Sequence, residues 1–248
     1  MEYAALAVWC FLVALGGGLV GLVLGNIRLP AVLLVASSPG AGAGANIGIS
    51  GVAAATASIA HIRAGRVNWR LFAWMAPPSI VGALIGGYVS GLVPGDVLLL
   101  AIAAVLLYSG FDLLRWRPPD RAATESHALD YTSAVATGFA IGLLGGFVGL
   151  ILGTLRMPAL IRIVGETPAR AVGTNVTVGF CVGVAGVLGH LPSEAPDWDL
   201  LAIGAAASIP GAALGARLTG RLSEIQLVRA VAWILFVAAA AMVVQALT

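Results

Sequence analysis

The chain has 248 residues, of which 60% are hydrophobic and 10% are charged, and its formal net charge is +2. A typical soluble domain has about 45–50% apolar and about 25% charged residues, so this composition excludes an ordinary soluble protein. The small net charge, without a basic tract, also excludes nucleic acid as a partner. The mean hydropathy of +1.01 predicts a multi-pass protein of the cell (cytoplasmic) membrane, surrounded by the lipid bilayer.

Long apolar segments follow one another along the chain, and each is long enough for a membrane-spanning helix. One polar stretch, residues 115–130, contains two consecutive prolines and clustered charge, and is predicted to be a linker outside the membrane. It separates a first transmembrane repeat, residues 1–114, from a second, residues 131–248. The predicted fold class is therefore an all-α polytopic membrane protein. The expected long helices are 3–25, 44–62, 70–92 and 94–114, then 131–153, 172–190, 199–220 and 225–247.

The two halves share a sequence repeat. Residues 17–31 and 145–159 align at a constant offset of 128, and ten of the fifteen aligned positions are identical. Polar and aromatic pairs continue at an offset of 129: Asn46 with Asn175, His61 with His190, and Trp69 with Trp198. Repeated halves of this kind are typical of secondary transporters.

A short apolar segment follows each glycine-rich stretch, at residues 29–38 and 157–165. Ten helical residues rise about 15 Å, which is about half of the bilayer core. These segments are therefore predicted to be half-helices after a break. Pro30 and Pro158 are expected to begin them, because proline suits the first turn of a helix.

The arginines predict how the halves are inserted. If the first long segment and half-helix of each half return to their starting side, ten arginines fall on one side, in accord with the positive-inside rule. Asp96, Glu194, Asp197 and Asp199 then fall on the other side. The two repeats are therefore expected to be inverted relative to each other, with both termini outside the cell. The ten arginines are Arg63, Arg66, Arg70, Arg115, Arg117, Arg121, Arg170, Arg217, Arg221 and Arg229.

Arg28 and Arg156 are equivalent in the repeat, and each interrupts an apolar stretch just before a proline. An arginine at the bilayer centre costs about 2.5–3.5 kcal/mol on insertion scales, so it normally has a partner or serves a transport pathway. Gly25 and Gly153 let the backbone break beside them, and a half-helix N-terminus adds a positive dipole end. These features together predict a site for a small anion. Alternatively, both arginines reach the membrane interface or bond freed backbone carbonyls.

Other polar residues accompany the two arginines. Their amides and hydroxyls are candidates to bond an oxyanion, and the alternative is helix capping or bonding between helices. They are Asn26 and Thr154 at the breaks, and Asn46, Thr174 and Asn175 where the next long segment of each half opens.

The histidines and serines do not predict a reaction centre. His61 and His190 lie at segment ends, where an interfacial or loop position is expected, and they have no cluster of Cys or carboxylates that would make a metal site. Ser38 and Ser50 have no spaced base, so nucleophilic catalysis is not supported. The protein is expected not to be an enzyme and to have no cofactor.

Two sequence blocks carry a family resemblance. The second half has Arg-Met-Pro-Ala-Leu at 156–160 and Thr-Pro-Ala-Arg-Ala-Val-Gly-Thr-Asn at 167–175, and the first half repeats the pattern more loosely at 28–32 and 43–46. This pattern resembles the sulfite exporter TauE/SafE family over essentially the whole chain. The resemblance implies a transporter of sulfite, sulfonates or related organosulfur anions.

The mechanism expected from these features is alternating access, with a single anion pathway between the two breaks. An anion channel that uses the same paired arginines is one alternative. A permease for a non-sulfur carboxylate anion is the other. A homodimer is compatible with the sequence.

Overall fold

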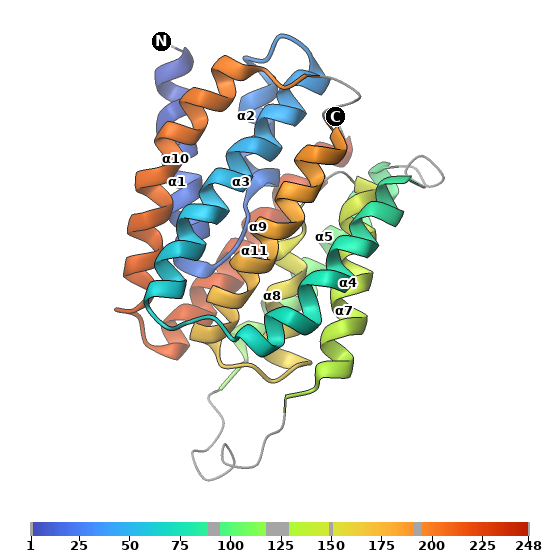
Figure 1. Ribbon diagram of the computed structural model, residues 1–248, viewed down its shortest axis with the longest axis vertical. Helices are drawn as coiled ribbons and strands as arrows, with labels where there is room; N and C mark the ends of the chain where they lie inside the picture. The colour runs from blue at the N-terminus through green and yellow to red at the C-terminus, as the bar shows by residue number, and fades with distance from the viewer. Residues whose placement is uncertain (1, 89–94, 118–128, 149–150, 191–194, 248) are drawn as a thin grey trace.

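The computed structural model describes residues 2–88, 95–117, 129–148, 151–190 and 195–247 (Figure 1). These residues form ten α-helices and no strand, so the predicted all-α fold is confirmed. Arg121, Glu194 and most of the predicted linker lie outside the described residues. The helices are α1 (Glu2–Val20), α2 (Gly25–Leu33), α3 (Pro39–Arg63), α4 (Trp69–Tyr88), α5 (Gly95–Leu114), α7 (Tyr131–Val148), α8 (Gly153–Arg162), α9 (Pro168–His190), α10 (Trp198–Thr219) and α11 (Glu224–Leu247).

Four stretches in the described part of the chain are long and apolar enough to cross a membrane: Glu2–Val20, Gly44–Arg63, Trp198–Thr219 and Glu224–Leu247. Large apolar side chains are exposed on the outside of the bundle, among them Leu12, Phe111, Trp233 and Val244. An apolar surface of this kind is stable against lipid rather than water. The chain is therefore a multi-pass membrane protein.

The first break turns the chain back on itself. Val32 at the end of α2 packs with Leu6 near the start of α1, so residues 21–33 return to the end where α1 began. Ala45 and Leu200 belong to the same cluster, so α3 and α10 also start at this end. Both chain termini lie there, at the upper end in Figure 1.

The helix ends that carry arginines gather at the opposite end of the bundle. Arg66, in the α3–α4 loop, donates a hydrogen bond to the backbone carbonyl of Ala216 near the end of α10, at 2.8 Å. Gly173 near the start of α9 faces the backbone of Arg66. At the ends of α8 and α5, Arg162 forms an ion pair with Asp112 at 2.6 Å. Which side of the membrane this end faces stays a prediction.

Counterpart helices make counterpart contacts. α1 packs along α10, and α7, the counterpart of α1 in the repeat, packs along α4, the counterpart of α10. Gly211 on α10 faces the backbone of Phe11, and Gly82 on α4 faces that of Phe139, which lies 128 residues after Phe11. A Cβ atom at either glycine would collide with the facing carbonyl, so the glycines permit close helix packing.

The half-helices begin earlier than the sequence suggests. α2 begins at Gly25 and α8 at Gly153, so the expectation that Pro30 and Pro158 begin them is wrong. Both prolines lie inside the helix, because the carbonyls of Leu24 and Leu152 already accept helical hydrogen bonds from the N–H groups of Arg28 and Arg156. The first break is residues 21–24, where Gly21 has a φ of +67°, a conformation that glycine adopts without strain. Both candidate arginines therefore lie in the first turn of a half-helix.

Candidate anion-binding site

The broken segments of the two halves meet inside the bundle at Asn175, on α9. Its Nδ2 group donates to the backbone carbonyl of Gly21 at 2.7 Å and to that of Gly153 at 3.0 Å. Gly21 lies in the first break, and Gly153 begins α8 after the second. A break frees backbone carbonyls that the helix no longer satisfies, and a buried carbonyl needs a donor. One amide therefore ties both broken segments together.

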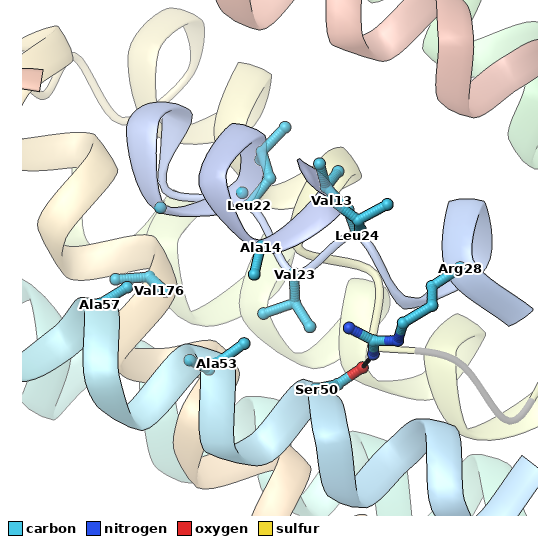
Figure 2. A pocket seen from close by; sticks show the side chains of 13 residues that line it. Val13, Ala14, Leu22, Val23, Leu24, Arg28, Ser50, Ala53, Ala57 and Val176 are labelled. Atoms are coloured by element: carbon cyan, nitrogen blue, oxygen red, sulfur yellow. Dashed lines mark hydrogen bonds between the residues drawn. The ribbon is translucent and has the colours of Figure 1, made fainter. Parts of the chain in front are cut away.

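Arg28 is bound tightly to α3 (Figure 2). Its Nε group donates to Asn46 Oδ1 at 2.9 Å, and one terminal nitrogen donates to the Asn46 backbone carbonyl at 3.0 Å and to Ser50 Oγ at 2.5 Å. Asn46 in turn donates to the Gly25 carbonyl at 3.1 Å. The arginine side chain is 2% exposed. The guanidinium of the first half is therefore buried, fixed and well supplied with acceptors.

Arg156 is equally buried but almost free of partners. It is 1% exposed, and it makes a long hydrogen bond of 3.4 Å from Nη1 to Asn175 Oδ1. Its Nε group has no acceptor among the described residues. In that part of the chain neither Arg156 nor Arg28 forms an ion pair with a carboxylate. A buried cation without a counter-charge is costly, so the arrangement favours a bound anion.

One difference between the repeats contributes to this contrast. Ser50, which accepts from Arg28, has Gly179 as its counterpart 129 residues later. Glycine offers no hydroxyl to Arg156. A Cβ atom at Gly179 would also come within 2.8 Å of the Val23 side chain. Gly179 therefore removes an acceptor and makes room for the first break.

Asn26 is a second buried donor without a partner. It is 4% exposed, and its Nδ2 group finds no acceptor in the described structure. It lies in the first turn of α2, before the first intrahelical hydrogen bond, from the Arg28 N–H to the Leu24 carbonyl at 3.3 Å. Its counterpart Thr154 is 1% exposed in the first turn of α8. Both residues thus lie at helix N-termini, where anions are favoured.

A pocket opens beside Arg28, between α1, the first break, α3 and α9 (Figure 2). It is small, with a cavity volume of about 20 Å³, and it is lined by apolar and glycine residues except for Arg28 and Ser50. Arg156 is not among the lining residues. In this conformation Arg156, whose Nε group has no acceptor among the described residues, therefore does not reach the pocket.

The structure brings most of the predicted site residues together in two clusters. In the first half these are Gly25, Arg28 and Asn46, and in the second Gly153, Arg156 and Asn175. Thr174 has a different neighbour, because its hydroxyl accepts the Asn68 backbone N–H at 2.9 Å.

The sequence interpretation missed two residues. Ser50 was considered only as a nucleophile, although its spacing of four residues from Asn46 places both on one face of a helix. His61 was expected at the membrane interface or in a loop, but it is fully buried. Its Nε2 atom lies 3.0 Å from the carbonyl oxygen of Gly18. It therefore satisfies a carbonyl near the end of α1. The side chain of its counterpart His190 lies outside the described residues.

No group of three or more His, Cys, Asp or Glu in the described residues could hold a metal ion. The fold instead combines a lipid-facing helical bundle with two half-helices. Each half-helix follows a break in the chain and carries a buried arginine in its first turn. These features define a membrane transporter.

The comparisons with known proteins place the chain more closely. The sequence profile of the sulfite exporter TauE/SafE family matches residues 6–242, so the chain belongs to this family, and the predicted resemblance is confirmed. The family and the relatives found are transporters rather than enzymes.

Two relatives illustrate the range of similarity. A "Probable membrane transporter protein" of Xylella fastidiosa (strain 9a5c) is 30% identical over 174 residues, covering 66% of this chain and 64% of that protein. The "Probable membrane transporter protein YunE" of Bacillus subtilis (strain 168) is 23% identical over 248 residues, covering 90% of this chain and 89% of that protein. No solved structure matches the chain.

Proposed function

We propose that this protein carries small sulfur-containing oxyanions, such as sulfite or sulfonates, across the membrane by alternating access. The observation that supports this most strongly is Arg156, a fully buried guanidinium whose Nε group has no acceptor and which has no carboxylate partner among the described residues. An oxyanion bound there would satisfy the donor and the charge together.

The two arginines have different parts in this proposal. Arg156 contacts the anion, because its buried Nε group lacks an acceptor among the described residues. Arg28 holds the first break against α3, because its Nε group and one terminal nitrogen bond Asn46 and Ser50. The unpaired amide of Asn26 is a further donor that an oxyanion can use.

The matched contacts of the two halves support an inverted repeat. The α1–α10 contact has its counterpart in α7–α4, and α5 packs against its own counterpart α11. We infer that an approximate two-fold axis in the membrane plane relates the halves and exchanges the two ends of the pathway. The arginine-rich end is then cytoplasmic and both termini are external.

The choice of a sulfur oxyanion rests on the family and on the site chemistry. The family is described as sulfite exporters, while the names of the relatives specify no substrate. Arginine presents a planar fork of donors that suits an anion with several oxygens. The apolar lining of the neighbouring pocket suits the carbon portion of a sulfonate.

The test is flux in liposomes that contain the purified protein. Sulfite, sulfate, sulfoacetate, taurine and simple carboxylates are offered separately. We expect saturable flux of sulfite or a sulfonate that is lost in Arg156→Ala. Flux of carboxylates without flux of any sulfur anion would overturn the substrate assignment. Unitary currents in place of saturable flux would overturn alternating access.

A further inference from the structure

Buried hydrogen bonds join the two halves near the arginine-rich end. Asn68, in the α3–α4 loop, donates its Nδ2 group to Glu166 Oε2 in the α8–α9 loop at 2.5 Å. The other carboxylate oxygen of Glu166 accepts the Thr167 N–H at 2.8 Å. Asn68 is 6% exposed and Glu166 is 5% exposed. We call this contact between the halves the Asn68–Glu166 latch.

A counterpart contact exists at the other end of the bundle. Asp197 follows Asn68 by 129 residues and is its repeat equivalent. Its Oδ2 atom accepts the Ser37 N–H at 3.3 Å, and its own N–H donates to the Ala41 carbonyl at 3.1 Å. Ser37 and Ala41 belong to the first half and Asp197 to the second. We call this contact the Asp197–Ser37 latch.

Both latch residues also begin a helix in the same way. Asn68 Oδ1 accepts the Leu71 N–H at 3.1 Å at the start of α4, and Asp197 Oδ1 accepts the Leu200 N–H at 3.3 Å at the start of α10. Each is an N-cap whose remaining bonding group reaches the opposite half. The shared position argues that the two latches are equivalent parts of the fold.

The two latches differ in strength. The Asn68–Glu166 contact is buried and charge-assisted, whereas the Asp197–Ser37 contact is a longer bond in an exposed position. Charge-assisted bonds away from water are the stronger kind, and exposed ones are weakened by solvent. The stronger latch is also linked to the site, because the Asn68 N–H bonds Thr174, next to Asn175.

We propose that these two latches are the gates of the transport pathway, and that the Asn68–Glu166 latch keeps the arginine-rich end closed in this conformation. To open that end, Glu166 must separate from Asn68, which removes one of the contacts that hold the start of α9 to the first half. Asn175 lies on that segment and holds both breaks. The inference rests on the proposed function, since alternating access requires a gate at each end.

The test measures opening directly, with Val172→Cys as a reporter in a protein whose native Cys10 and Cys181 are replaced by Ala. Val172 is fully buried on α9 and its backbone faces the first break at Gly21. A water-soluble maleimide labels the purified protein only when this region opens. Loss of a charge-assisted bond predicts that Glu166→Ala or Asn68→Ala raises the labelling rate about tenfold to a hundredfold.

The matched control is Asp112→Ala, which removes the exposed ion pair with Arg162 at the same end. It is expected to leave the labelling rate unchanged. The gate is overturned if folded Glu166→Ala and Asn68→Ala label at the wild-type rate, or if Asp112→Ala raises the rate as much. Should the alanine variants fail to fold, Glu166→Gln keeps the shape without the charge, and an unchanged rate in that variant also overturns the gate.

The labelling assay needs no substrate. A negative result here leaves the flux measurement with sulfur anions untouched. Absence of flux in liposomes, conversely, leaves the labelling result intact. The two proposals can therefore fail separately.

Discussion

Arg28 and Arg156 are counterparts in the repeat, yet three hydrogen bonds tie the first to α3 while one long bond reaches the second. The frame of packed helices around them, the pairs α1–α10 and α7–α4, does not differ in this way. The close contact of Gly211 with Phe11 in one pair is repeated by Gly82 with Phe139 in the other. The packing between the halves is thus duplicated, while the bonding of the arginines has diverged. Under the proposed function, one guanidinium supports the broken backbone and the other is left for the anion.

The largest expected effect concerns stability. Arg28→Met leaves three buried acceptors on Asn46 and Ser50 without their donor, at about 1–3 kcal/mol each, so we expect it to lower the free energy of unfolding by at least about 3 kcal/mol. Arg156→Met removes a buried charge with an unpaired group, so it should be neutral or stabilising. Thermal unfolding of both variants in detergent measures the difference. Equal losses would contradict the division of roles between the two arginines.

Ser50→Ala tests why the halves differ. It removes one acceptor from Arg28 and makes the first half resemble the second, where Gly179 holds the equivalent place. We expect a loss of about 1.5–3 kcal/mol, because the hydrogen bond is buried and charge-assisted. Ser58→Ala is the matched control on the same helix, since the Ser58 hydroxyl is buried without a partner. A similar loss in both variants would mean that the bond to Arg28 is not the cause.

The duplicated frame predicts two equal effects. Gly82→Ala and Gly211→Ala each place a Cβ atom against a facing backbone carbonyl, and each should cost about 1–3 kcal/mol of unfolding free energy. Gly51→Ala is the control, because nothing lies within 4 Å of its Cβ position. It should stabilise α3 by up to about 1 kcal/mol. A large effect at only one of the two glycines would show that the α1–α10 and α4–α7 contacts are not energetically equivalent.

Much of the fold could be predicted from the sequence. Apolar segments longer than the bilayer core indicated the helices, and the offsets of 128 and 129 indicated the repeat. The polar interruptions at Arg28 and Arg156 pointed to buried charge, since arginine is rarely found in such stretches without a function. The starts of the half-helices were missed because proline also fits inside a helix whose first turn precedes it.

The difference between the arginines could not be predicted in the same way. Ser50 and Gly179 contribute to it, and neither residue is unusual in a helix rich in small residues. Their importance follows from which atoms face the guanidinium after α3 and α9 have packed against the breaks. The contact of Asn68 with Glu166 is likewise long-range, 98 residues apart in sequence, and no local pattern marks it.

The central claim is that Arg156, rather than Arg28, binds the transported anion. The most direct test is the Kd for sulfite of the purified protein, measured by calorimetry in the absence of oxygen. Arg156→Ala should raise the Kd about tenfold to a hundredfold while the thermal unfolding temperature is maintained, and Arg156→Lys should restore part of the affinity. Ser50→Ala, which removes a bond to Arg28 and none to Arg156, should bind with nearly the wild-type Kd. A folded Arg156→Ala protein that binds sulfite as tightly as the wild type would contradict the account.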